Sequence, residues 1–405
     1  MKIERHKAYK DSEIEHLGEV PKHWRTQRIK DLSVLQSGNN ITSEQIEAEG
    51  KYPVYGGNGL RGYFSKYTNN GSYILIGRQG ALCGNINHAF GRFWATEHAI
   101  VVYLKHSICM KWYGEMLRTM NLNQYSVSAA QPGLSVDRIK RLLLPVPPLP
   151  EQKTIAHYLD TKTAQIDRKI DLLTQKATLY SNLKQSLINE TVTRGLDKTV
   201  PMKDSGIEWI GEVPKHWIFC RHKDNFSFIT TRCLDPTLLK LGLENIEGKT
   251  GQHISTENDF DGDGIEFKKN DILFGKLRPY LAKVYLAEFG GSAVGDIFVY
   301  RPKSNTIPKF ARYLMLSNRY IDVINSSTVG AKMPRVGVSF IANLPVITPP
   351  IAEQKAIADY LDTKTAQIDQ IIQTINTQIE KLKELRKTLI NDVVTGKIKV
   401  VENEH

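Results

Sequence analysis

The sequence of 405 residues contains only four cysteines, and no two of them form a CxxC pair. This scarcity argues against both a zinc site and a disulfide framework, and it fits a reducing compartment. No apolar run is long enough to span a membrane, and the first residues do not form a basic-then-apolar signal peptide. We therefore expect a cytoplasmic protein without a membrane partner.

The sequence also lacks motifs that mark common DNA-modifying and nucleotide-binding enzymes. An adenine methyltransferase is expected to carry an Asn/Asp-Pro-Pro-aromatic tetrapeptide, but the two Pro-Pro pairs read VPPL from Val146 and TPPI from Thr348. Both are better interpreted as helix entries, because proline suits the first turn of a helix. Gly57, Gly59 and Gly62 satisfy GxGxxG, yet strand-like sequence follows them where a helix should begin. We therefore predict no catalytic residues, no metal site and no cofactor.

The composition is that of a globular protein with more than one domain. Hydrophobic residues make up 41% and charged residues 24% of the chain, and 405 residues exceed what one ordinary core holds. The net charge of +11 makes a polyanionic partner plausible through phosphate contacts and counterion release. A merely basic protein has the same composition, so charge alone leaves the partner open.

Two stretches of the sequence occur twice. Glu151–Asp167 reads EQKTIAHYLDTKTAQID and Glu353–Asp369 reads EQKAIADYLDTKTAQID, with fifteen of seventeen positions identical and a spacing of 353 − 151 = 202 residues. Asp11–Trp24 and Asp204–Trp217 share GEVPKHW at a spacing of 217 − 24 = 193 residues. These spacings are too long for a solenoid repeat. They indicate duplication of a whole half-protein.

Each copy of the longer stretch follows a proline cluster and begins a segment with a heptad-like apolar seam. The segments end near Gly195 and Gly396, where helix C-caps are expected. We predict two helices of roughly 40 residues, each about 60 Å long, that pack on each other; two separate helical hairpins are the alternative. The seam residues are Ile155, Leu159, Ile166, Leu173, Tyr180, Leu183 and Leu187 in the first segment and Ile357, Leu361, Ile368, Ile371, Ile375, Leu382, Leu385 and Leu389 in the second.

Between the repeated stretches lie two inserts, 25–143 and 218–343, that look largely unlike each other in sequence. Glycine-rich, strand-like stretches begin at Tyr52, Gly71 and Gly264, and helical stretches begin at Ser107 and Pro308. ILIGRQG in the first insert stands opposite ILFGKLR in the second, 272 − 74 = 198 residues further on. We predict that the inserts share a mixed α/β fold and differ in surface chemistry.

The doubled GEVPKHW motif, the doubled proline–EQ–helix segment and the inserts with GRQG and GKLRPY resemble the specificity (S) subunit of type I restriction–modification enzymes. The resemblance covers essentially the whole chain. It implies that each insert is a target recognition domain reading one half of a split DNA sequence. It also implies a central antiparallel coiled coil that docks two modification (methyltransferase) subunits, which restriction (motor–nuclease) subunits then join. Adenine methylation would use S-adenosylmethionine bound on the modification subunits.

On this basis the predicted fold class is α+β, with two mixed α/β target recognition domains, two long helices packed as an antiparallel coiled coil, and a pseudo-two-fold internal repeat. The predicted segments are recognition domain 1 (1–147), helix 1 (148–196), recognition domain 2 (197–348), and helix 2 with a tail (349–405). The implied partners are double-stranded DNA, two modification subunits and restriction subunits. The chain itself is predicted to be a targeting subunit, with catalysis on its partners.

The candidate DNA-reading residues are polar or basic side chains beside glycine or proline turns at matching places in the two inserts. Arginine and lysine pair well with guanine, and glutamine with adenine, while backbone amides at turns meet phosphates. Any one of them can instead contact only phosphate or stabilise a loop. The candidates are Asn58, Arg61, Arg78, Gln79 and Gln131 in the first insert, and Lys276, Arg278, Tyr280, Lys332 and Arg335 in the second.

Two other functions stay open from the sequence. The triplet at Glu266–Lys268, close to Asp259, Asp261 and Asp263, would suit the core of a free-standing metal-dependent DNA endonuclease. Glu-x-Lys triplets are also common on exposed strands. A stand-alone DNA-binding regulator is the third possibility, and it predicts tight specific binding without a partner subunit.

Overall fold

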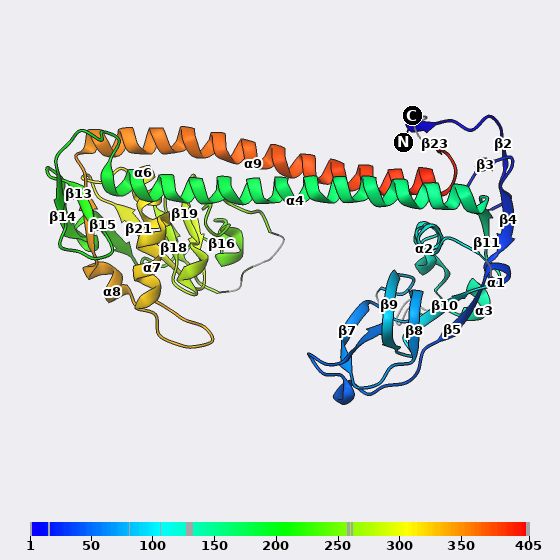
Figure 1. Ribbon diagram of the computed structural model, residues 1–405. Helices are drawn as coiled ribbons and strands as arrows, with labels where there is room; N and C mark the ends of the chain where they lie inside the picture. Colours follow the sequence, from blue (N-terminus) through cyan, green and yellow to red (C-terminus); the bar gives the residue numbers. More distant parts are fainter. Residues whose placement is uncertain are drawn as a thin grey trace. The chain divides into compact units, whose positions relative to one another are not determined.

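The computed structural model describes residues 2–14, 17–80, 82–105, 107–126, 133–256, 260 and 262–401. The chain divides into two compact units, unit 1 with Met1–Leu172 and Thr377–His405, and unit 2 with Leu173–Asn376. Each unit therefore contains one insert together with one half of each long helix (Figure 1). This division crosses both helices, whereas the four segments predicted from the sequence separate the helices from the inserts.

The insert of unit 1 is built on a six-stranded sheet of order β5-β10-β8-β9-β6-β7. Only β6 and β9 pair in parallel; the other neighbours in this sheet are antiparallel. Along β8, Ile74 and Ile76 join one core cluster and Leu75 joins another, as the two-residue period of a strand requires. The elements are β5 (Ser33–Ser37), β6 (Tyr52–Gly56), β7 (Gly59–Phe64), β8 (Asn69–Gly77), β9 (Ile86–Ala95), β10 (Ala99–Leu104), α2 (Met110–Thr119) and α3 (Val136–Ile139).

The insert of unit 2 contains a four-stranded sheet, β15-β21-β18-β19, and a three-stranded sheet, β16-β20-β17. The helical stretch predicted from Pro308 is two helices, because Ser317 ends the first and accepts a hydrogen bond from the Tyr320 N–H at the start of the second. The elements are β15 (Phe226–Ile229), β16 (Lys240–Leu241), β17 (Ile265–Phe267), β18 (Ile272–Gly275), β19 (Val284–Leu286), β20 (Gly291–Ala293), β21 (Ile297–Pro302), α6 (Pro308–Leu316), α7 (Asn318–Ser326) and α8 (Val338–Asn343).

Shorter elements connect each insert to the long helices, and all of them except β1 and β23 occur in two copies. The strand that enters each insert pairs with the strand that leaves it, β4 with β11 in unit 1 and β14 with β22 in unit 2. In unit 1 these elements are β1 (Lys2–Glu4), β2 (Tyr9–Asp11), β3 (Glu19–Pro21), β4 (Arg25–Arg28), α1 (Ile29–Leu32), β11 (Leu143–Val146) and β23 (Lys399–Val401). In unit 2 they are β12 (Met202–Asp204), β13 (Glu212–Pro214), β14 (Ile218–Arg221), α5 (His222–Asn225) and β22 (Pro345–Thr348).

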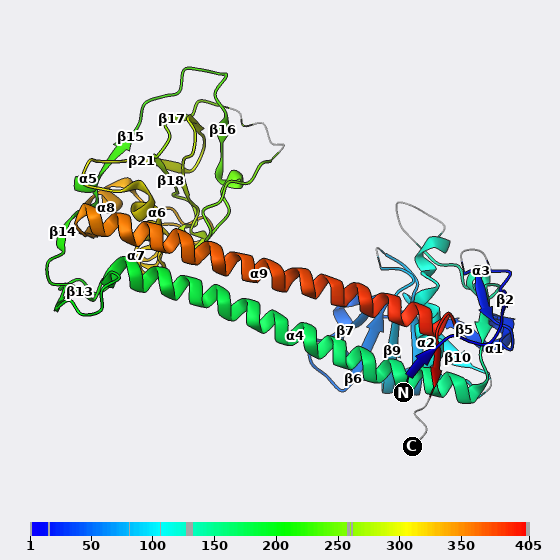
Figure 2. The ribbon, with the colours of Figure 1, turned by 90° about the horizontal axis from the view of Figure 1, so that it is seen from above.

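The long helices are α4 (Leu149–Arg194) and α9 (Ile351–Val394), and they lie side by side (Figures 1 and 2). In unit 2, Lys184 of α4 donates to both carboxylate oxygens of Asp369 of α9, at 2.8 and 2.7 Å. In unit 1 the pair at the repeat-related positions is Arg386 with Asp167, at 3.0 Å. The helices are thus antiparallel within each unit, as predicted. Both end at a left-handed glycine, Gly195 (φ 75°) and Gly396 (φ 80°).

The predicted seam is only partly correct. Two leucines of the seam, Leu183 and Leu385, are 53% and 54% exposed. The six buried members are Ile155, Leu159, Ile357, Leu361, Ile368 and Ile375. Ile371 is also exposed, at 37%. A pair of helices buries one face of each partner, and a seven-residue spacing in the sequence does not distinguish that face from the outer one.

The near-identity of the repeated stretches has a structural reason within each unit. Glu151 Oε2 accepts a hydrogen bond from the indole N–H of Trp24 at 3.2 Å and lies 2.9 Å from Nε2 of His23. The second copy repeats this His–Trp–Glu cluster with His216, Trp217 and Glu353, whose indole–carboxylate distance is 2.9 Å. Because Trp24 and Trp217 are buried, each cluster fixes the segment before an insert to the first turn of a long helix.

The glutamine of each EQ pair contacts the interior of the insert, at the residue before its first long α-helix. Gln152 is buried, and its side-chain oxygen accepts from the Cys109 N–H at 2.9 Å, directly before α2. Gln354 makes the same contact with the Ile307 N–H at 2.8 Å, directly before α6. Because both glutamines are buried and bonded, a change at either one leaves a part-buried backbone N–H without its partner.

Candidate nucleic-acid interface

A pocket of about 510 Å³ in unit 1 brings three of the predicted residues together. Asn58, Arg61 and Gln79 line it with His98, and all three predicted side chains are exposed. The loop after β8 is fixed by its backbone, since the Arg78 N–H donates to the His98 carbonyl and the Arg78 carbonyl accepts from the Leu134 N–H, both at 2.8 Å. The side chains at this site therefore project from an ordered backbone.

Glycines allow the three loops around this pocket to approach each other. A Cβ atom on Gly77 would lie 2.2 Å from the Gly57 carbonyl oxygen. A Cβ atom on Gly57 would lie 3.1 Å from the carbonyl oxygens of Gln79 and His98. The glycine-rich sequence is thus required by backbone packing, in agreement with its interpretation as a turn rather than a dinucleotide site.

The corresponding loop of unit 2 carries a cluster of charges. Asp296 accepts from Nε and Nη2 of Arg335 at 3.2 and 3.0 Å, and it lies 3.6 Å from Nζ of Lys276. The Arg335 guanidinium holds the pKa of Asp296 below its usual range. Lys276 Nζ also lies 5.4 Å from the centre of the Phe298 ring. Two predicted DNA-reading cations therefore share one carboxylate that orients them.

Arg278 is held in a left-handed conformation, with φ of 49°. A non-glycine residue in this region carries a cost of roughly 1 kcal/mol, and such residues gather at functional sites. Its backbone N–H donates to the Pro334 carbonyl at 2.8 Å, and its guanidinium reaches the Lys332 carbonyl at 3.5 Å. Tyr280 lies two residues further on and is 47% exposed. The structure thus brings Lys276, Arg278, Lys332 and Arg335 into one pair of neighbouring loops.

The loops of the two units have the same backbone arrangement. The Lys276 N–H donates to the Asp296 carbonyl at 2.9 Å, and the Lys276 carbonyl accepts from the Val336 N–H at 3.1 Å. These are the two hydrogen bonds that Arg78 makes in unit 1. The predicted correspondence of GRQG with GKLR is therefore correct, and the side chains that differ sit on equivalent backbones.

Sequence reasoning missed His98 and Asp296. They occupy matching places in the two inserts, but only the fold brings them against the candidate loops, through the bonds from the Arg78 and Lys276 N–H groups to their carbonyls. The Arg78 side chain does not line the pocket of unit 1, although the Arg78 backbone fixes the loop beside that pocket. Gln131 lies outside the described residues.

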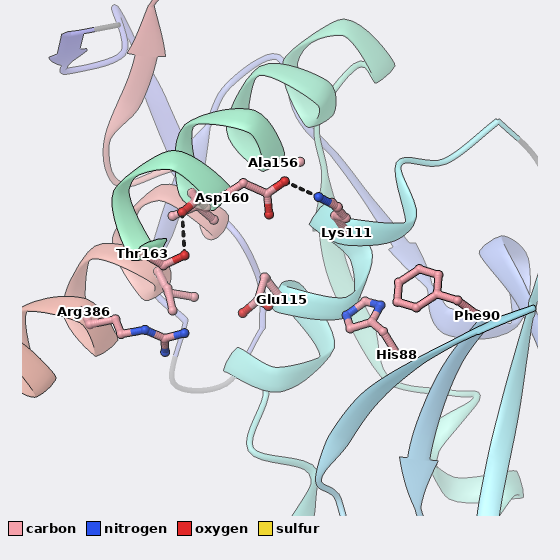
Figure 3. Close-up of a pocket in the computed structure, with 10 residues that line it drawn as sticks. His88, Phe90, Lys111, Glu115, Ala156, Asp160, Thr163 and Arg386 are labelled. Carbon is pink, nitrogen blue, oxygen red and sulfur yellow. Dashed lines mark hydrogen bonds and ion pairs between the residues drawn. The ribbon is translucent and has the colours of Figure 1, made fainter. Parts of the chain in front are cut away.

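A second pocket in unit 1, of about 240 Å³, lies between α2, β9 and the two long helices (Figure 3). Lys111 of α2 bonds Asp160 of α4 at its rim, and Glu115 faces it with a buried Oε2 that has no hydrogen-bond partner in the described part of the chain. In unit 2 the place of Glu115 is taken by Tyr313, whose hydroxyl donates to Asp362 at 2.7 Å. An aromatic ring thus stands in one copy where the other copy has a cavity.

The family model of the type I restriction modification DNA specificity domain matches residues 21–177 and 248–381, which is more than half of the chain. The chain belongs to this family. Its members bind DNA and assemble with other subunits of a restriction–modification complex. The chain is accordingly the DNA sequence-specificity subunit of a type I system, and its role is targeting rather than catalysis.

The chain is also similar in sequence to individual members of the family. The specificity subunit of the type I restriction enzyme EcoprrI of Escherichia coli is 42% identical over 183 residues, covering 44% of this chain and 42% of the relative. That of EcoDI, also of Escherichia coli, is 22% identical over 409 residues, covering 94% of this chain and 90% of the relative. Similarity thus extends along nearly the whole chain at lower identity.

Solved structures agree on the fold. A chain from a study of complex assembly and conformational transition of the type I R-M system superimposes with a TM-score of 0.68 at 15% identity, covering 93% of this chain and 98% of the other. The HsdS subunit from Thermoanaerobacter tengcongensis gives 0.53 at 14% identity, covering 93% and 98%. None of the helices in the described ranges combines the length and apolar character that crossing a membrane requires.

No comparison favours the endonuclease or the stand-alone regulator. Asp259 and Asp261 of the supposed nuclease core lie outside the described residues. Asp263 is 3.4 Å from Arg232 in an exposed ion pair, and Glu266 lies on β17 opposite Ser292.

Proposed function

We propose that each unit reads one half of a bipartite duplex DNA target through the loops described above. The observation that supports this most is the equivalence of the two loop backbones, which carry different side chains. One scaffold with two sets of side chains suits a split target whose halves differ. The residues proposed to contact DNA are Asn58, Arg61, Arg78, Gln79 and Gln131 in one half, and Lys276, Arg278, Tyr280, Lys332 and Arg335 in the other.

The chemistry of the two sets supports different base preferences. Unit 2 offers lysine and arginine, whose donors suit the O6 and N7 acceptors of guanine in the major groove. Unit 1 adds the side-chain amides of Asn58 and Gln79, which can both donate and accept and therefore suit adenine. Arg61 and the cations of unit 2 would also contact phosphates and position the chain on the duplex.

We further propose that segments 1–147 and 197–348 act as recognition domains and that helical segments 148–196 and 349–405 set the spacing between the half-sites. Because the restriction–modification complex acts on DNA, we propose a cytoplasmic location. Two modification subunits would bind the helices, and restriction subunits would join them.

Matched exposed leucines on the helices support two equivalent seats for the modification subunits. Leu183 in unit 2 and Leu385 in unit 1 stand at repeat-related positions and are about equally exposed. Each has another exposed leucine on the helices of its own unit, Leu179 (67%) and Leu172 (56%) respectively. Exposed apolar groups of this kind are typical of the centre of a protein–protein interface.

Methylation mapping in a host that carries the matching modification subunit tests the split target. Replacing residues 25–143 with another insert should change one half-site and leave the other intact. Arg335→Ala should broaden the set of bases accepted at one half-site only, and Gln79→Ala should do the same at the other half-site only. A continuous site, or a change in both halves from one substitution, would contradict the proposal.

Native mass spectrometry tests the two seats. Leu183→Asp and Leu385→Asp should each leave one modification subunit bound, and the double variant should leave none. Leu234→Asp is a matched control, because Leu234 is 90% exposed and lies in the insert of unit 2. Two bound subunits in the double variant would refute the assignment.

A further inference from the structure

Three possible metal ligands converge in unit 1, where the segment after β1 meets the first turn of α4. His23 Nε2 lies 2.9 Å from Glu151 Oε2, and His6 Nε2 lies 3.8 Å from Glu151 Oε1. The ligand atoms available to a metal all lie within 4.8 Å of one another. His6 is only 8% exposed, and its Nε2 has no hydrogen-bond partner among the residues described, since its distance from Glu151 is too long for such a bond.

Neighbouring groups hold these side chains in place. The His6 backbone N–H donates to the Tyr9 hydroxyl at 3.1 Å, and the His6 ring stands edge-on to Trp24 with centroids 6.1 Å apart. The Trp24 indole donates to Glu151 Oε2, so it orients the carboxylate as outer-shell partners do in metal sites. The His23 side chain is 52% exposed, which leaves room for a water molecule as a further ligand.

Comparison with unit 2 shows which of the three side chains belong to the repeat and which one is particular to unit 1. His216 and Glu353 form the same pair at 2.6 Å, so a histidine next to this glutamate is part of the repeated architecture. The position that matches His6, at the offset of the GEVPKHW repeat, is Thr199, an exposed residue. The repeat therefore explains His23 and Glu151, but it does not explain a buried histidine with an unsatisfied ring nitrogen.

We propose that His6, His23 and Glu151 bind one divalent transition-metal ion, with zinc as the best-matched class. Two imidazole nitrogens, one carboxylate oxygen and an open position form a common zinc donor set, and Ni²⁺ or Co²⁺ accepts the same donors. Bonds of about 2.0–2.1 Å place tetrahedral ligands about 3.3 Å apart, between the two distances observed here. The scarcity of cysteine argues against a zinc site with thiolate ligands, and it has no bearing on a site built from nitrogen and oxygen.

The bound ion would fasten three parts of unit 1 to one another. Its ligands come from the segment before β2, from the loop that carries GEVPKHW and from the start of α4. The first of these segments also lies against the chain that follows α9, because β1 pairs with β23 and the Tyr9 hydroxyl at the start of β2 donates to the Lys397 carbonyl at 3.0 Å. The role is structural and independent of how DNA is read.

Metal titration of the full-length, untagged chain tests the site. After removal of metals with a chelator, Zn²⁺ binding is measured by competition with a chromophoric chelator, and coordination is followed by the ligand-field absorption of Co²⁺. We expect one tight site per chain and a rise in the melting temperature of about 5 °C with excess Zn²⁺. His6→Gln should weaken Zn²⁺ binding by at least about 100-fold. His216→Gln is the matched control and should leave it unchanged.

Several outcomes would overturn the proposal. They are absence of a tight Zn²⁺ site, equal binding by the wild type and His6→Gln, an equal loss in His216→Gln, or thiolate-to-cobalt charge-transfer absorption that assigns the metal to cysteine. If His6→Gln does not fold, as judged by its circular dichroism in chelator, the half-exposed His23→Gln decides by the same criterion.

Discussion

Asp296 offers the sharpest test of the interface in unit 2, because one carboxylate orients two cations that we propose to meet DNA. Arg335 keeps the pKa of this carboxyl low, so Asp296 is ionised at neutral pH and Asp296→Asn removes a full negative charge. The variant also replaces the two charge-assisted bonds to the Arg335 guanidinium with at most one weaker bond. Freed cations should bind any phosphate more readily and a particular base less selectively.

The size of both effects follows from the charges present. Each additional phosphate neutralised steepens the dependence of log K on log salt by about 0.9. One extra contact at Lys276 or Arg335 should therefore raise the non-specific affinity about eightfold at roughly 0.1 M salt. A correctly oriented bidentate arginine discriminates against a wrong base by roughly 5- to 150-fold, and this factor should fall at one half-site.

Fluorescence anisotropy with target and scrambled duplexes over a range of salt concentrations measures both quantities on the assembled methyltransferase. Asp263→Asn is a suitable control, because it removes the same charge from an exposed ion pair with Arg232 in the same unit. A salt slope and a specificity ratio that match those of the control would refute the role assigned to Asp296.

Three further predictions concern stability and spacing. Burial lowers the pKa of His222 to about 3, so between pH 6.5 and 3 the unfolded state binds a proton that the folded state does not. The free energy of unfolding of unit 2 should therefore fall by about 1.4 kcal/mol for each pH unit below about 6.5. Chemical denaturation monitored by hydrogen exchange measures it. His222→Ile, the residue found at the matching Ile29, should abolish that slope. Glu115→Tyr should fill the pocket of unit 1 as Tyr313 does in unit 2 and stabilise unit 1 by about 1–2 kcal/mol in urea denaturation, whereas Tyr313→Glu should destabilise unit 2; unchanged midpoints would contradict the packing argument. Seven residues inserted after both Leu172 and Asn376 should lengthen the spacer between half-sites by about three base pairs in methylation mapping, since about 10.5 Å of helix equals about three steps of about 3.4 Å. An unchanged spacer would show that the helices do not set the spacing, and insertion into one helix alone should destabilise the antiparallel pairing.

The periodic and repeated features of the chain could be predicted from the sequence. Proline entries and glycine caps located both long helices, and the offset between GRQG and GKLR matched loops whose backbones prove equivalent. The exposure of Leu183 and Leu385 could not be predicted, because period-seven spacing does not tell which face of a helix meets its partner. The function of Glu151 in holding Trp24 also depends on a contact between residues that are far apart in the sequence.

For the DNA-reading residues too, the sequence could not predict contacts between residues that are far apart in the chain. Arg61 and Gln79 were found because they stand beside turns, whereas Asp296 and His98 become relevant only when separate loops meet. The near-identity of the repeated stretch would suit two equivalent seats for one partner. Its glutamate and glutamine instead point into their own units, so internal packing accounts for part of that identity.

The two His–Trp–Glu clusters also bear on how such chains diversify. Each cluster joins a residue just before an insert to a residue just after it, and its members come from stretches that are nearly the same in both copies. A genetic exchange with its endpoints in those stretches therefore replaces an insert and regenerates the bonds that hold it. The boundaries at which recombination is structurally harmless thus coincide with the segments most alike in sequence, so a new specificity can arise in one event without selection for compensating changes.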